Sequence, residues 1–210
     1  MHEHTDIASK AVPAKCTACD RTLDSPLFCG SCRRLYPADG LNCFELLGLA
    51  PAYDIDANAL RQKYFKLMRD IHPDRMATGS ADVQRLCLRV NAQINEAYNV
   101  ILDPVLRAEY LLEISGGKSA ADDKHVPQDV LMNTLELREE IEESKAENDT
   151  ATLEKLRRQI QERFGEALGQ IAALARVLPG TDTDRKTLRG KLNAVRYFRK
   201  MLEAMEPPAP

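Results

Sequence analysis

The sequence is poor in aromatic residues and contains no tryptophan: Phe and Tyr together make up 5% of 210 residues. β-Sandwiches and barrels depend on aromatic and β-branched strands, so this scarcity argues against both and favours an all-α fold. Neither sign of charge is in excess, since the formal net charge is −3. That balance removes the usual electrostatic reason to expect nucleic-acid binding. No run approaches about 18 consecutive apolar residues, so no membrane span is expected.

The spacing of four of the cysteines indicates a metal-binding site. Two Cys-x2-Cys pairs, Cys16 with Cys19 and Cys29 with Cys32, can supply four thiolates to a tetrahedral ion. We expect Gly30 to permit the tight turn of the second pair. No ligand position stays open, which predicts a structural zinc ion. Iron in the same cage and a pair of disulfides are the alternatives, and a reducing compartment disfavours the disulfides.

Composition and periodicity divide the rest of the chain. The predicted segments are a disordered lead-in (1–15), the metal module (16–40), a first helical unit (41–113), a linker (114–127), a second helical unit (128–206) and a tail (207–210). In the first unit, helices near 56–72 and 80–102 carry apolar stripes that predict an antiparallel hairpin, closed by a short helix at 105–114. The second unit has helical patterns near 129–147, 152–178 and 183–205, which predict a three-helix bundle.

His72-Pro73-Asp74 lies where the first helix of the hairpin must end. The exposed positions of that helix are basic, and another arginine follows the tripeptide: Arg61, Lys63, Lys66, Arg69 and Arg75. A helix-breaking proline beside a solvated basic face would be an ordinary explanation. A proline-stiffened loop between two hairpin helices, however, resembles the J-domain of DnaJ-like co-chaperones. The resemblance implies that the loop and the basic face dock on a DnaK-class chaperone and stimulate its ATPase.

Longer motifs make the resemblance more specific. The segments 42–49, 72–75, 107–112 and 131–140 resemble HscB, the J-type co-chaperone family of iron–sulfur cluster assembly. The similarity covers about residues 42–205, and Leu-Met-x-x-Leu-Glu-Leu-Arg-Glu-Glu at 131–140 is its most discriminating motif. Asn42-Cys43 departs from the Asp-Tyr common in the family, which affects capping and packing rather than the docking loop. The tetracysteine module is similar to that of metazoan members.

The helix predicted at 129–147 has two apolar faces. At about 100° per residue, Val130, Thr134, Leu137 and Ile141 form one narrow stripe. Leu131, Met132 and Leu135 fall away from that stripe, among carboxylates. An apolar patch with a charged rim indicates a partner surface, and packing against neighbouring helices is the alternative. The resemblance implies that an IscU-like scaffold protein binds Leu131, Met132, Leu135, Glu136, Glu139, Glu143 and, on the last helix, Tyr197.

These observations predict a co-chaperone that is not itself an enzyme, because no Walker-type phosphate loop occurs. Its expected partners are the scaffold and an HscA/DnaK-class ATPase, with weak self-association at most. A zinc-dependent redox or iron–sulfur carrier protein and a general DnaJ-type client-binding chaperone are the alternatives. The first residues show neither a presequence nor a signal core, so we expect a cytoplasmic protein rather than one of the mitochondrial matrix.

Overall fold

The computed structural model describes residues 15–23, 25–72, 74 and 79–206 and divides after Asp103 into two compact units. The predicted tail, Pro73, Arg75 and all but Lys15 of the predicted lead-in lie outside the described residues. The described part is helical, with isolated β-bridges near the cysteines, as the composition predicts. No helix in these ranges has the length and apolarity needed to cross a membrane.

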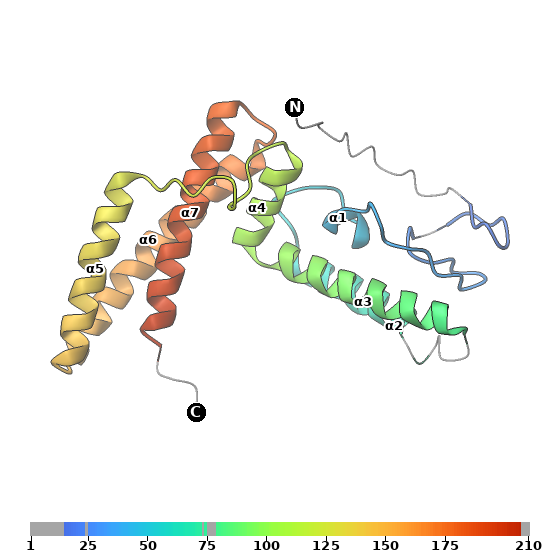
Figure 1. Ribbon diagram of the computed structural model, residues 1–210, viewed down its shortest axis with the longest axis horizontal. Coiled ribbons are helices and arrows are strands. Elements are labelled where there is room, and N and C mark those ends of the chain that lie inside the picture. Colours follow the sequence, from blue (N-terminus) through green and yellow to red (C-terminus); the bar gives the residue numbers. More distant parts are fainter. Residues whose placement is uncertain (1–14, 24, 73, 75–78, 207–210) are drawn as a thin grey trace. The chain divides into compact units, whose positions relative to one another are not determined.

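The first unit contains α1 (Cys43–Leu46), α2 (Ala57–Asp70) and α3 (Ala81–Leu102) (Figure 1). Side chains cap the start of each helix. Asn42 and Glu45 form a reciprocal capping box at α1, Asp56 accepts two backbone N–H groups of α2, and Ser80 accepts one of α3. These bonds satisfy N–H groups that the first turn of a helix leaves unpaired, so they fix where each helix begins.

The predicted hairpin stripes form the core of this unit. The fully buried side chains include Leu60 and Ile71 at the two ends of α2 and the α3 residues Cys87, Val90, Ile94, Ala97 and Ile101. Helix α1 adds Phe44. The Tyr64 ring stacks on Tyr98 with centroids 4.1 Å apart, which joins the middle of α2 to α3. Cys87 is a buried residue of this core.

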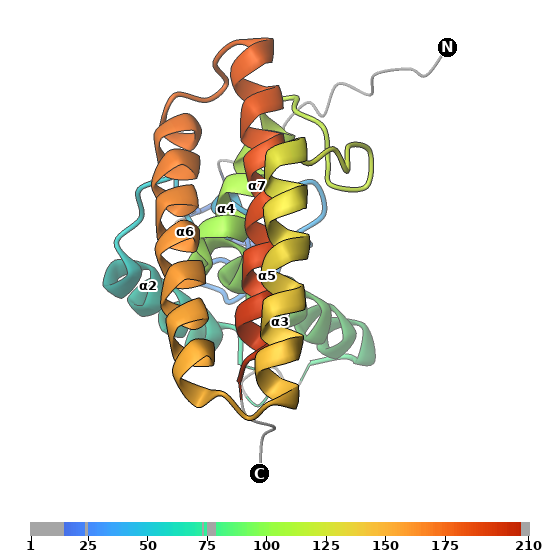
Figure 2. The same cartoon turned by 90° about the vertical axis from the view of Figure 1, so that its left-hand side faces the viewer.

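The second unit contains α4 (Pro104–Ile114), α5 (Gln128–Ala146), α6 (Thr150–Arg176) and α7 (Asp182–Ala204). Helices α5, α6 and α7 lie side by side (Figure 2). Their shared core consists of Leu137, Ile141, Leu156, Ile160, Phe198 and Met201. Helix α4 packs on α6 and α7. The sequence analysis grouped this helix with the hairpin instead; the domain boundaries drawn there stay a prediction.

A buried ion-pair network holds α4 to α7. The Glu109 carboxylate pairs with Arg189, and it accepts two hydrogen bonds of 2.6 and 2.7 Å from Arg196. Asn193 accepts a hydrogen bond from Arg189 and donates to the carbonyls of Asp123 and His125, both at 2.9 Å. The segment between α4 and α5, predicted to be a linker, is therefore tied to α7. Removing one partner of a buried pair leaves an uncompensated charge and costs about 3–5 kcal/mol.

Candidate functional site

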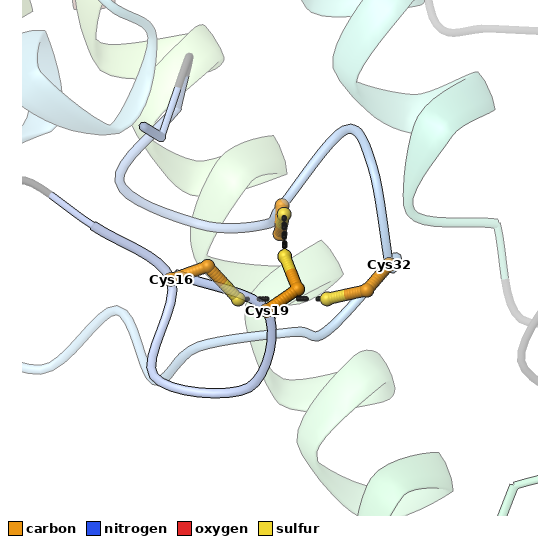
Figure 3. Close-up of side chains that lie close together, drawn as sticks. Cys16, Cys19 and Cys32 are labelled. Atoms are coloured by element: carbon orange, nitrogen blue, oxygen red, sulfur yellow. Dashed lines mark hydrogen bonds between the residues drawn. The ribbon is translucent and has the colours of Figure 1, made fainter. Parts of the chain in front are cut away.

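The four cysteine sulfurs converge on one point (Figure 3). All lie within 4.8 Å of one another, with separations of 3.5 Å for Cys16–Cys32 and 3.6 Å for Cys19–Cys29. A tetrahedral ion with metal–sulfur bonds of about 2.3 Å holds its ligands about 3.8 Å apart. A disulfide requires about 2.05 Å, and all four thiols are free. The four cysteines are therefore positioned to bind a metal ion.

Two equivalent backbone turns carry the ligands. In the first, Asp20 N–H donates to the Cys16 carbonyl at 2.9 Å; in the second, Arg33 N–H donates to the Cys29 carbonyl at 2.8 Å. Asp20 and Arg33 adopt positive φ angles of 54° and 59°. The left-handed residue thus follows the second cysteine of each pair. Gly30 lies in the turn of the second pair, as expected, but it is not among the described glycines with a positive φ. The CxxC spacing locates the ligands but does not show which residue closes the turn.

Tyr36, which the sequence analysis missed, shapes the electrostatics of the site. Its hydroxyl donates to the Cys16 sulfur at 3.1 Å and accepts the Thr17 N–H at 3.0 Å. This hydroxyl, helped by the Ala18 N–H, lowers the pKa of the Cys16 thiol to about 6. The backbone N–H groups of Cys32 and Ser31 lower the pKa of Cys29 against the effect of burial. Thiolate is the metal-binding form of cysteine, so these donors favour ligation.

Cys19 titrates in the opposite direction. A hydrogen bond from the Arg21 backbone lowers its pKa, but desolvation and hydrogen bonds with the neighbouring thiols outweigh that bond and raise the value to about 12. Four thiols this close together cannot all ionise without a cation between them, because like charges at such distances repel strongly. The cluster is therefore electrostatically suited to a divalent ion.

His72 and Asp74 lie in an exposed turn directly after α2. Their side chains are 51% and 90% exposed, and the Asp74 N–H donates to Nδ1 of His72 at 3.2 Å. The turn presents an imidazole and a carboxylate to solvent.

Two α3 side chains hold the end of α2 beneath that turn. The carbonyl of Ile71, the residue before His72, accepts hydrogen bonds from Asn91 at 2.8 Å and from the Cys87 thiol at 3.2 Å. Asn91 is buried and also donates to the Cys87 carbonyl. The sequence analysis did not identify Asn91, because nothing local marks a buried amide on an apolar stripe as the anchor of a distant loop.

The predicted basic face of α2 is exposed at Arg61, Lys63, Lys66 and Arg69. Lys63 donates to the Gly48 carbonyl at 2.8 Å, so its ammonium group also braces the end of α1. Phe65, between the two lysines, is 61% exposed. Basic residues around an exposed aromatic ring indicate a contact surface for an acidic partner, and the sequence reading had missed the ring.

Helix α5 has the two faces that its periodicity predicts. Thr134, Leu137 and Ile141 are buried, whereas Leu131, Met132 and Leu135 are 40%, 53% and 48% exposed. The carboxylates of Glu136, Glu139 and Glu143 are exposed as well. On α7, Tyr197 is 37% exposed, away from the buried Leu188 and Val195. The alternative, in which these leucines are buried against neighbouring helices, therefore does not hold within the second unit.

Comparison with known proteins assigns both units. A DnaJ domain model matches residues 42–110, and a model of the HSCB C-terminal oligomerisation domain matches residues 126–206. Among solved structures, HscB from Vibrio cholerae is 26% identical with a TM-score of 0.68, covering 79% of this chain and 95% of that chain. Human HscB (21% identity, TM-score 0.75, covering 91% and 96%) and Jac1 from Saccharomyces cerevisiae (22%, 0.60, 85% and 97%) share the fold.

The hairpin, the exposed His72–Asp74 turn and the DnaJ match define a J-domain co-chaperone. The C-terminal match narrows the class: the chain belongs to the HscB family of J-domain co-chaperones.

Proposed function

We propose that the protein delivers an iron–sulfur scaffold protein of the IscU type to an HscA/DnaK-class chaperone and stimulates ATP hydrolysis there. The observation that carries the proposal is the pairing, in one chain, of an exposed His72–Asp74 turn after a basic helix with an exposed apolar and acidic helix face in the C-terminal unit. Each of the two surfaces is exposed within its own unit, so each is accessible to a partner.

The first surface comprises His72, Asp74 and the basic face of α2, with Pro73 and Arg75 as predicted members outside the described residues. Arg61, Lys66 and Arg69 supply positive charge that steers association with an acidic partner. The carbonyl anchor at Ile71 reduces the conformational freedom that the loop would lose on docking. The ATP site belongs to the chaperone.

The second surface comprises Leu131, Met132, Leu135, Glu136, Glu139, Glu143 and Tyr197. Burying three apolar side chains at about 25 cal/mol per Å² supplies affinity, while a rim of carboxylates selects a partner with basic residues around its own apolar patch. The segment from Glu136 to Asp149 contains seven acidic residues and two basic ones, Arg138 and Lys145, so this end of α5 carries a negative net charge. An anionic partner would be repelled there.

For the cysteine cluster we propose zinc as the resident ion. Four thiolates with no open ligand position are typical of structural zinc, and such an ion would hold residues 16–40 together, a segment too small to fold on its own core. Iron in the same cage would instead favour the carrier alternative, and the metal content of the purified protein distinguishes them. We also propose that the protein is located in the cytoplasm, the compartment where it is made.

The test combines the purified chain, the scaffold and the chaperone. We expect the wild-type protein to accelerate steady-state ATP hydrolysis and the scaffold to increase that stimulation. His72→Ala should abolish the stimulation while scaffold affinity and helical circular dichroism stay unchanged, because His72 lies in an exposed turn. Stimulation by His72→Ala equal to that of wild type would refute the J-domain role.

His125→Ala is the matched control, since His125 is another exposed histidine but lies in the second unit, far along the chain from the turn. It should leave the stimulation unchanged. Suppression of aggregation of unrelated unfolded proteins, without scaffold binding, would instead support the general client-binding alternative.

A further inference from the structure

The second unit contains a basic hollow that shares only Tyr197 with the proposed surfaces. It has a volume of about 520 Å³ and lies between the segment that precedes α5 and one side of α7. Its lining residues are Ala120, Lys124, Val126, Asn193, Arg196, Tyr197, Arg199, Lys200 and Glu203. We use the name basic hollow for this set.

The walls of the basic hollow are fixed before any ligand arrives. Asn193 is buried and holds the carbonyls of Asp123 and His125, on either side of Lys124, to α7. Arg196 is held by two hydrogen bonds to Glu109. A site whose walls are already bonded loses little conformational entropy on binding.

The hollow carries an excess of positive charge. Its lining has four cationic groups (Lys124, Arg196, Arg199 and Lys200) and one carboxylate, Glu203. The adjoining network adds the cation of Arg189 and the carboxylate of Glu109, so five cations stand with two carboxylates, a net charge of +3. Lys124 and Lys200 are exposed, and within the described part of the chain neither makes an ion pair. The hollow therefore offers unneutralised charge to an anion.

The basic hollow shares Tyr197 with the scaffold surface. Helices α5 and α7 run in the same direction, because Pro127 lies beside Gly190 and Lys145 donates to the Ala204 carbonyl. Tyr197 is midway between Gly190 and Ala204, which sets it level with the middle of α5, where Leu135 lies. The hollow also includes Val126, two residues before α5 begins. Because Tyr197 belongs both to the proposed scaffold surface and to the lining of the hollow, a protein that binds that surface and contacts Tyr197 also contacts the hollow.

We propose that the basic hollow receives acidic side chains of the same scaffold protein that docks on α5. The inference rests on the proposed function and specifies the charge pattern of the partner. The negative end of α5 requires basic residues around the partner's apolar patch, and the hollow requires Asp or Glu beside that patch. Two regions of opposite charge, joined at one aromatic ring, fix the orientation in which the scaffold can dock.

The experiment reverses charge in the hollow. Lys124→Glu with Lys200→Glu should weaken scaffold binding about tenfold or more and reduce the dependence of the association rate on salt. Lys155→Glu with Lys186→Glu makes the same charge change at exposed lysines of the same unit outside the hollow, and it should change affinity less than about twofold. Lys200→Gln, a milder change, should weaken binding about threefold. Thermal midpoints of all variants should stay close to wild type.

Reversing acidic residues of the scaffold to Lys, one at a time, should identify one or two positions that restore binding to the Lys124→Glu, Lys200→Glu protein. If Leu135→Ala weakens scaffold binding but both Lys pairs behave alike, the proposed function stands and this inference is wrong. If the wild-type chain does not bind the scaffold, the proposed function fails, and the inference with it. Lys200-dependent binding of nucleic acid or of anionic vesicles, with scaffold binding unaffected, would also overturn it.

Discussion

At the scale of single residues, the exposed functional groups depend on buried partners that never touch a ligand. His72 and Asp74 are presented to solvent, but the Ile71 carbonyl beneath them is held by Asn91 and Cys87 from α3. Cys16 is similarly influenced by the Tyr36 hydroxyl. Substituting such a partner residue should change the position or the pKa of the functional group, although the functional residue itself is not mutated.

Asn91→Ala should therefore impair the docking loop from a distance. Of the two described side-chain donors to the Ile71 carbonyl, the substitution leaves the weaker one, the Cys87 thiol. We expect a loss of about 1–3 kcal/mol in unfolding free energy. Stimulation of the chaperone ATPase should fall several-fold, while scaffold affinity should stay unchanged. Chemical denaturation, ATPase assays and scaffold binding measure the three quantities.

The control is Asn95→Ala, one turn further along α3. Asn95 likewise makes a side-chain hydrogen bond, which it accepts from the Tyr64 hydroxyl at 2.8 Å, but it is exposed and lies further from the loop along the helix. Equal loss of stimulation in the two variants would show that Asn91 acts only through global stability.

At the scale of elements, α5 serves two purposes with two faces. One stripe packs into the bundle core through Leu137 and Ile141, and the other leaves Leu131, Met132 and Leu135 exposed. A helix that was apolar on one face only would be explained by folding alone. Folding does not explain the second face, so we interpret it as a binding surface for a partner protein.

Leu135→Ala and Leu137→Ala separate those purposes. Leu135→Ala removes a side chain that is 48% exposed, so stability should change by less than about 0.5 kcal/mol while scaffold affinity falls by about 1–2 kcal/mol. Leu137→Ala leaves a cavity in the core and should destabilise the unit by about 2–5 kcal/mol, with little direct effect on binding. Thermal melts and binding assays on both variants check this. Equal destabilisation by the two substitutions would make the second face part of the core.

At the scale of the whole molecule, the chain combines a metal module with helical units that have cores of their own. The second unit has a core of its own, whereas the buried apolar residues of the cysteine module, apart from cysteines, are Leu27, Leu35 and Ala38 among the described residues. Small segments with so little core depend on a metal for their fold. Loss of the metal should therefore be a local event.

Chelation, or Cys29→Ser with Cys32→Ser, should unfold residues 16–40 and release about one Zn²⁺ per chain. Helical circular dichroism should change little, because the helices keep their own cores. Metal analysis and limited proteolysis detect the two effects. Protein prepared under reducing conditions that contained two disulfides and no metal would contradict the prediction.

The sequence by itself determined the features that depend on neighbours along the chain. Apolar spacing predicted the helices and the two faces of α5, and the CxxC pairs predicted the ligand set. The capping box of Asn42 and Glu45 at the start of α1 is equally local. Capping bonds join residues three positions apart, and one helix face is defined by residues three or four apart. The roles of these surfaces came from resemblance to a family, and at residue level they stay predictions.

Only the tertiary structure decided the contacts between residues far apart in the chain. Glu109 meets Arg189 across 80 positions, Asn91 reaches Ile71 across 20, and Tyr36 reaches Cys16 across 20. Nothing in the local pattern marks these residues, because a buried Asn or Arg on a helix looks like any polar residue until its partner is brought to it. Packing of the segment before α5 on α7 created the walls of the basic hollow, and packing of α2 on α3 set the pose of the docking turn.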